Sequence, residues 1–74
     1  MTAHEAAART AKAMRLVAVF EAHGADAVTV AALPATGWAT VATLAGTRPP
    51  SDATKATVVG ILRGHEAIPA RAAR

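Results

Sequence analysis

The spacing of apolar residues predicts an amphipathic helix that begins after Thr2 and ends near His23. Apolar residues recur at positions i, i+3, i+4 and i+7 along its second half and define one core-facing stripe, which consists of Ala13, Leu16, Val17 and Phe20. Thr2 and Glu5 have the spacing of a capping box, and Gly24 supplies a stop. The first half is mainly alanine with charged residues, so we expect it to project beyond the core.

A second, short helix is predicted over residues 27–33, with Asp26 as its N-cap. Val28 and Val30 alternate with Thr29 and Ala31, as they would in a strand. An isolated strand would have nothing to pair with in this chain, so the helix is the preferred interpretation.

The third predicted helix, which begins near Pro34 or Thr36 and ends at Gly46, is the clearest amphipathic segment of the chain. Its apolar stripe consists of Trp38, Val41, Ala42 and Ala45. Four threonines fall together on the opposite side, namely Thr36, Thr40, Thr43 and Thr47. This pattern predicts one buried face and one hydroxyl-rich face.

A fourth helix is predicted from Ser51, which can cap it, to Arg63, because Gly64 supplies a stop. Pro49 and Pro50 prevent the third helix from continuing into it. Its core stripe consists of Thr54, Val58, Ile61 and Leu62. We therefore expect an all-α fold, a small four-helix domain over residues 1–64 whose last two helices form a corner packed against the first, followed by a basic C-terminal tail over residues 65–74.

Composition limits the size of the core and the kinds of site that the chain can build. Alanine accounts for 22 of the 39 apolar residues, so the core of this 74-residue chain depends on few large side chains, and a partner or a second copy is expected. The absence of cysteine excludes disulfides and thiolate zinc sites. A formal net charge of +3 favours acidic partners, with nucleic acid first.

Residues 27–47 form an uncharged run that is long enough to cross a bilayer. The run contains five threonines, two glycines and Pro34, which its five Val and Leu residues cannot offset. The apolar block near the N-terminus is too short for the core of a signal peptide. We therefore expect no membrane association and a cytoplasmic location.

Candidate catalytic and metal-binding residues are few. His4, His23 and His65 are far apart in sequence, and no two histidines share a helical face as metal ligands commonly do. The carboxylates are explained by capping, dipole pairing or solvation, and Ser51 has no neighbouring base to activate it. These observations predict a protein that is not an enzyme and that needs no metal or cofactor.

The segment VATLAGTRPPSDATKATVVGIL, residues 41–62, resembles the helix-turn-helix of LacI-type repressors. The matching positions are Ala42, Ala45, Gly46, Ser51, Thr54, Val58 and Leu62. The segment departs from that pattern by an insertion at Arg48, Pro49 and Pro50, which extends the turn. The resemblance implies that the corner is helix-turn-helix-like and that the last helix enters the major groove of DNA.

The residues that would contact DNA on this interpretation are Arg48, Ser51, Lys55, Arg63, Thr40 and Thr43. The favoured function is therefore that of a small DNA-binding protein, a dimeric or accessory regulator of transcription.

A protein-protein interaction module is the alternative, because the face of the fourth helix opposite its core stripe carries Ala53, Ala56 and Gly60, which read no bases but let another helix approach closely. Trp38 belongs to the core by its spacing, and it could also be an interface hot spot. The partner on this surface could be a second copy of the chain, which would give a homodimer, or a different protein. In the second case the chain would act as a small subunit, adaptor or inhibitor.

Overall fold

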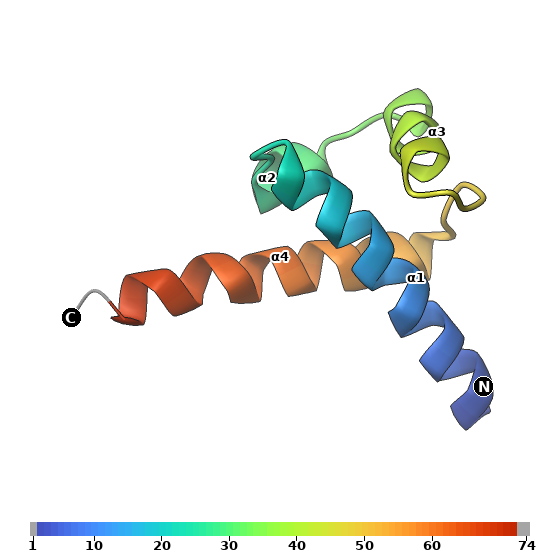
Figure 1. The fold of residues 1–74 in the computed structure, drawn as a ribbon, viewed down its shortest axis with the longest axis horizontal. Coiled ribbons are helices and arrows are strands. Elements are labelled where there is room, and N and C mark those ends of the chain that lie inside the picture. Colours follow the sequence, from blue (N-terminus) through green and yellow to red (C-terminus); the bar gives the residue numbers. More distant parts are fainter. Residues whose placement is uncertain (1, 73–74) are drawn as a thin grey trace.

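The chain folds into four α-helices joined by short connections (Figure 1). A computed structural model describes the backbone of residues 2–72 and the side chains of residues 2–65. The helices are α1 (Ala3–Ala22), α2 (Ala27–Ala31), α3 (Ala35–Leu44) and α4 (Asp52–Ala72). No strand occurs in residues 2–72, which confirms the prediction of a small all-α domain and the choice of helix for α2.

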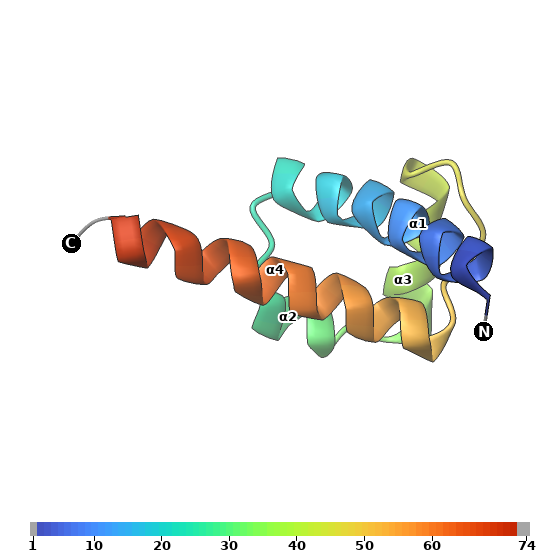
Figure 2. The same cartoon turned by 90° about the horizontal axis from the view of Figure 1, so that it is seen from below.

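Helices α1 and α4 make the most extensive contact between elements of the fold. Helix α4 also packs against α2, and α3 packs mainly against α1. Figure 2 shows α1 next to α4, with α2 behind α4 and α3 behind both. The buried apolar residues form one core, which consists of Ala13, Leu16, Val17, Phe20, Ala27, Val30, Trp38, Ala42, Val58 and Leu62. The apolar stripes expected from the sequence therefore do face one another across a common interior.

Several local signals act at the helix ends as predicted. Thr2 Oγ1 accepts a hydrogen bond from the backbone N–H of Glu5 at 3.1 Å, and Asp26 Oδ1 accepts one from the N–H of Thr29 at 2.7 Å. The backbone and side-chain hydrogen bonds from Thr29 lower the pKa of the Asp26 carboxyl, because they stabilise its charged form. These caps satisfy N–H groups that have no partner within their own helices.

Two glycines end helices by adopting the left-handed conformation. Gly24 after α1 has φ 69° and Gly46 after α3 has φ 71°. At the second of these ends, the N–H of Thr47 donates to the carbonyl of Ala42 at 2.9 Å, which is the long hydrogen bond of a Schellman motif. The predicted ends of these two helices are confirmed to within two residues.

The end of the fourth helix was predicted wrongly. Gly64 does not stop it, and α4 continues to Ala72. Unlike Gly24 and Gly46, Gly64 keeps a helical backbone, and a glycine ends a helix only where the chain takes up the left-handed conformation. The predicted basic tail thus begins within a helix, and its side chains from residue 66 onward lie outside the described residues.

Burial also separates residues that look alike in the sequence. Val30 is fully buried, whereas Val28 is 74% exposed, and Leu44 and Met14 are also largely exposed. Pro50, which was considered only as a helix breaker, is buried. The core is therefore smaller than the count of apolar residues suggests.

Candidate binding groove

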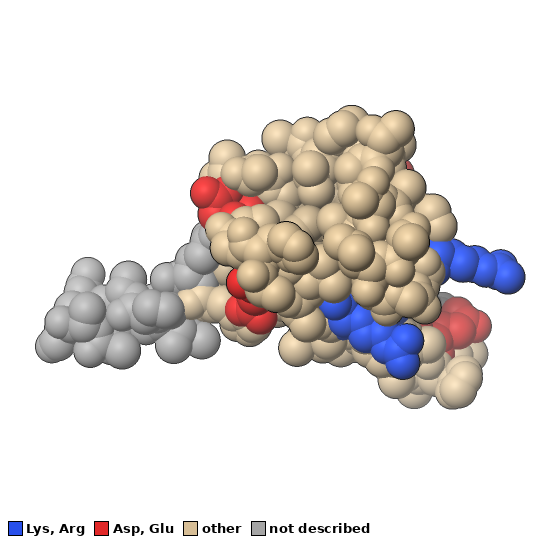
Figure 3. Space-filling view, turned by 45° about the horizontal axis from the view of Figure 1, so that its top comes forward, with Lys and Arg blue, Asp and Glu red and all other residues tan. Residues whose placement is uncertain are grey.

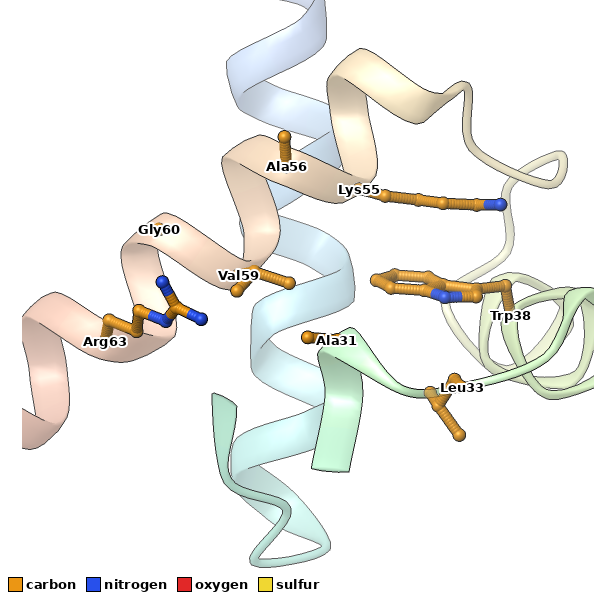
Figure 4. A pocket seen from close by; sticks show the side chains of 8 residues that line it. All are labelled: Ala31, Leu33, Trp38, Lys55, Ala56, Val59, Gly60 and Arg63. Atoms are coloured by element: carbon orange, nitrogen blue, oxygen red, sulfur yellow. The ribbon is translucent and has the colours of Figure 1, made fainter. Parts of the chain in front are cut away.

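An open groove of about 500 Å³ lies between α4 and the segment that joins α2 to α3. Its lining residues are Ala31, Leu33, Trp38, Lys55, Ala56, Val59, Gly60 and Arg63 (Figure 4). Five of these come from α4 and the others from α2, the connection that follows it, and α3. The groove is thus a product of the tertiary fold, and hereafter it is called the α4 groove.

Trp38 closes one end of the α4 groove. It is only 3% exposed, and its ring meets Phe20 of α1 edge to face, with centroids 5.4 Å apart and an interplanar angle of 82°. This arrangement places the positive edge of one ring against the negative face of the other and fixes the indole in position. The prediction that Trp38 is a core residue is confirmed, and one side of the same ring lines the groove.

Lys55 lies over the indole of Trp38 at the same end. Its Nζ is 5.8 Å from the ring centroid, in the range of a cation–π interaction, which is worth about 0.5–1 kcal/mol at an exposed site. Figure 4 shows the lysine chain extending along the ring. The same Nζ is 3.7 Å from Oδ1 of Asp52, whose side chain is fully exposed. These two contacts hold one positive charge at the mouth of the groove.

Between Lys55 and Arg63, the part of the groove floor that α4 supplies consists of small or half-buried apolar residues. Ala56 and Gly60 are exposed, and a Cβ added to Gly60 would meet no atom within 4 Å. Val59 is half-buried beside them. Arg63 follows at the other end, eight residues after Lys55, and Figure 4 shows its guanidinium turned back toward Val59. The groove therefore has an apolar floor with a positive charge at each end.

The groove brings together members of both sets of predicted site residues. Lys55 and Arg63 come from the predicted DNA-binding set, and Trp38, Ala56 and Gly60 come from the predicted interface set. The remaining lining residues, Ala31, Leu33 and Val59, were not predicted from the sequence. Periodicity within one helix carries no information about which residue of α2 will face α4, so no signal in the sequence could have found the first two.

The other predicted site residues lie outside the groove. Arg48 and Ser51 are exposed in the connection before α4, and Ala53 is exposed on its first turn. Thr40 and Thr43 are exposed on α3, where each Oγ1 donates to the backbone carbonyl four residues earlier, both at 3.0 Å. Those two hydroxyl protons are thus already used within the helix.

The side chain of Ser51 caps the N-terminus of α4. Its Oγ accepts a hydrogen bond from the backbone N–H of Thr54 at 3.3 Å and lies 3.2 Å from Thr54 Oγ1. This pairing gives the buried Thr54 hydroxyl a partner, and it confirms Ser51 as the cap of α4.

A contact between α1 and α4 joins two residues that are distant in sequence. His65 Nδ1 lies 2.8 Å from Glu21 Oε2, and both side chains are close to half exposed. The two residues are 44 positions apart, so their pairing could not be predicted from the sequence. Within the described residues, no three His, Cys, Asp or Glu side chains come together as metal ligands.

The charged residues do not form a continuous stripe on the face drawn in Figure 3. There the basic side chains stand apart from one another, acidic side chains lie among them, and most of the surface is uncharged. A protein that tracks a phosphate backbone usually presents a row of Lys and Arg on one face. The face drawn in Figure 3 has no such row.

Comparison with known proteins adds no assignment, since no protein-family model, curated protein or solved structure matches the chain. In residues 2–72, no helix is both long enough and apolar enough to cross a membrane. The α4 groove and the residues around it are therefore the candidate functional surface.

Proposed function

We propose that the protein is a non-enzymatic protein-interaction module that docks a helix of another protein in the α4 groove. The observation that carries this proposal is the groove itself, in which a fixed Trp38, two cations and an apolar floor lie together. Trp and Arg are the residue types most enriched at interface hot spots, and an apolar groove is the usual receptor for an amphipathic helix.

The small residues of α4 in the groove favour a helix as the ligand. Ala56 and Gly60 are one helical turn apart and exposed, so a second backbone could approach α4 closely there. Helices pack with their axes about 8–10 Å apart, and the small side chains favour the lower end of that range. The partner's own larger side chains would then reach Leu33 and Val59, which are half-buried in the groove lining.

DNA binding by the helix-turn-helix-like corner is the second candidate. It is favoured by the exposure of Arg48 and Ser51 directly before α4, with Lys55 one turn into that helix, the positions that the resemblance assigns to DNA. In that case the protein would act as a dimeric or accessory regulator of transcription.

Two observations place DNA binding second. Asp52 puts an exposed carboxylate on the first turn of α4, where phosphates and base edges would come closest. The exposed positions that follow, Ala53, Ala56 and Gly60, carry no group that forms hydrogen bonds with bases.

A matched pair of variants separates the two candidates. Ala56→Arg fills the groove, whereas Ala53→Arg adds the same charge on the exposed side of α4 outside the groove lining. Helical peptides selected from a displayed library on the wild-type protein should lose binding to Ala56→Arg and keep it for Ala53→Arg. If no recovered peptide loses binding to Ala56→Arg while keeping it for Ala53→Arg, helix docking is refuted.

The same two variants give a different result if the ligand is DNA, because both are then expected to bind it more tightly. Each added arginine would strengthen binding to a random duplex at low salt and steepen its salt dependence by about one phosphate contact. Fluorescence anisotropy with a labelled duplex measures this directly. Light scattering on the wild-type protein and Ala56→Arg shows whether a second copy is the occupant, since a wild-type dimer would then become a monomer.

A further inference from the structure

The charges of the α4 groove point to the chemistry of its partner. Lys55 and Arg63 are the two charged residues in its lining, and both are positive. The carboxylate of Asp52, 3.7 Å from Lys55 Nζ, is fully exposed to solvent and does not belong to the groove lining. We propose that the partner is an acidic amphipathic helix with two carboxylates about two turns apart, one for each of these cations. This inference rests on the helix-docking function proposed above.

The spacing of the two cations sets the spacing of the carboxylates. Lys55 and Arg63 are eight residues apart on α4, which corresponds to about 12 Å along the helix axis. On a partner helix, residues i and i+7 lie on one face about 10.5 Å apart. The long side chains of lysine, arginine and glutamate can absorb the difference between these lengths.

The floor between the cations determines what lies between the carboxylates. Leu33 and Val59 are half-buried, and Ala56 and Gly60 leave space above the helix. Apolar residues at i+3 and i+4 of the partner would point into this space, because they share the face defined by i and i+7. The expected partner motif is therefore glutamate or aspartate at i and i+7 with large apolar residues at i+3 and i+4.

A second copy of this chain does not supply that motif. Its five acidic residues are Glu5, Glu21, Asp26, Asp52 and Glu66, and no two of them are seven or eight positions apart. The two pairs that share a helix are farther apart, by 16 positions for Glu5 and Glu21 of α1 and by 14 positions for Asp52 and Glu66 of α4. The partner is accordingly a different protein.

The inference is tested by selecting helical peptides, randomised along one face, on the wild-type protein and on Arg63→Glu. Wild-type binders should be enriched in acidic residues at two positions seven apart. Binders of Arg63→Glu should carry Lys or Arg at one of the two positions and an acid at the other. Arg15→Glu, which makes the same charge change on an exposed part of α1, should select the wild-type pattern.

The size of the effect can be checked with one selected peptide. Replacing each of its two acidic residues by the matching amide should weaken binding about 2- to 5-fold, as expected for a partly exposed ion pair, and should reduce the salt dependence. Unchanged affinity of the doubly substituted peptide would overturn the inference.

The outcomes distinguish the inference from the function on which it rests. Peptides that lose binding to Ala56→Arg but show no acidic preference would leave helix docking intact and remove the acidic partner. If no recovered peptide discriminates Ala56→Arg from Ala53→Arg, both the acidic partner and helix docking are refuted. Duplex DNA bound more tightly by both arginine variants would replace both with a nucleic-acid interface.

Discussion

Two valines test whether the packing described above carries the stability of the domain. Val58 of α4 is fully buried, and Val28 of α2 is 74% exposed. Val58→Ala removes the equivalent of two buried methylene groups, worth about 1.6 kcal/mol by transfer, and the cavity left behind raises the cost to roughly 2–3 kcal/mol. The higher helix propensity of alanine offsets about 0.5 kcal/mol of this loss in the free energy of unfolding. The net loss expected for Val58→Ala is about 2 kcal/mol.

That loss is large for a domain of this size. At roughly 0.05–0.15 kcal/mol per residue, a chain of 74 residues has a free energy of unfolding of about 4–11 kcal/mol. Val28→Ala makes the same chemical change at an exposed helical position, and we expect its effect to stay within about 0.5 kcal/mol of zero. The difference between the two variants therefore reports burial.

Urea unfolding followed by tryptophan fluorescence measures both variants. Trp38 is the sole tryptophan and is 3% exposed in the folded protein, so its emission should shift to longer wavelength on unfolding. With a slope of about 1 kcal/mol per molar urea, the midpoint for Val58→Ala should fall by about 2 M and that for Val28→Ala should barely move. Equal shifts for the two valines would refute the packing of α4 described here.

Further predictions concern the backbone, the caps and the contact between α1 and α4. Gly60→Ala should raise the free energy of unfolding by about 0.5–1 kcal/mol, because the new methyl meets no atom within 4 Å, whereas Gly24→Ala, at φ 69°, should lower it by about 1–2 kcal/mol; a thermal melt of each variant measures both signs. Because the pKa of Asp26 is lowered in the folded state, its charge contributes stability above the ordinary pKa of an aspartate, and this contribution is lost as the pH falls through the folded value. The stability difference between the wild-type protein and Asp26→Asn should therefore shrink on acidification, and a difference that is constant with pH would contradict the cap. A double-mutant cycle with His65→Ala and Glu21→Gln should give a coupling energy of about 0.2–1 kcal/mol at neutral pH, the range for exposed pairs, and zero coupling would show that the 2.8 Å contact does not persist in solution.

Sequence by itself determined the features that depend on neighbouring residues. Caps at Thr2, Asp26 and Ser51 and the stops at Gly24 and Gly46 were all predictable, because each depends on hydrogen bonds or φ angles within a few positions. The helical stripes were predictable for the same reason, since a period of 3.6 residues places their members on one face. These local signals were enough to predict the all-α fold.

Tertiary structure decided which surfaces meet. Only the packing of α2 on α4 separates the buried Val30 from the exposed Val28, although both are valines of one short helix. The α4 groove also arises there, because Leu33 and Trp38 reach it from elements that local periodicity cannot place beside Arg63. Gly64 was misjudged for a related reason, since glycine permits both a helical and a left-handed backbone and only the folded chain selects one.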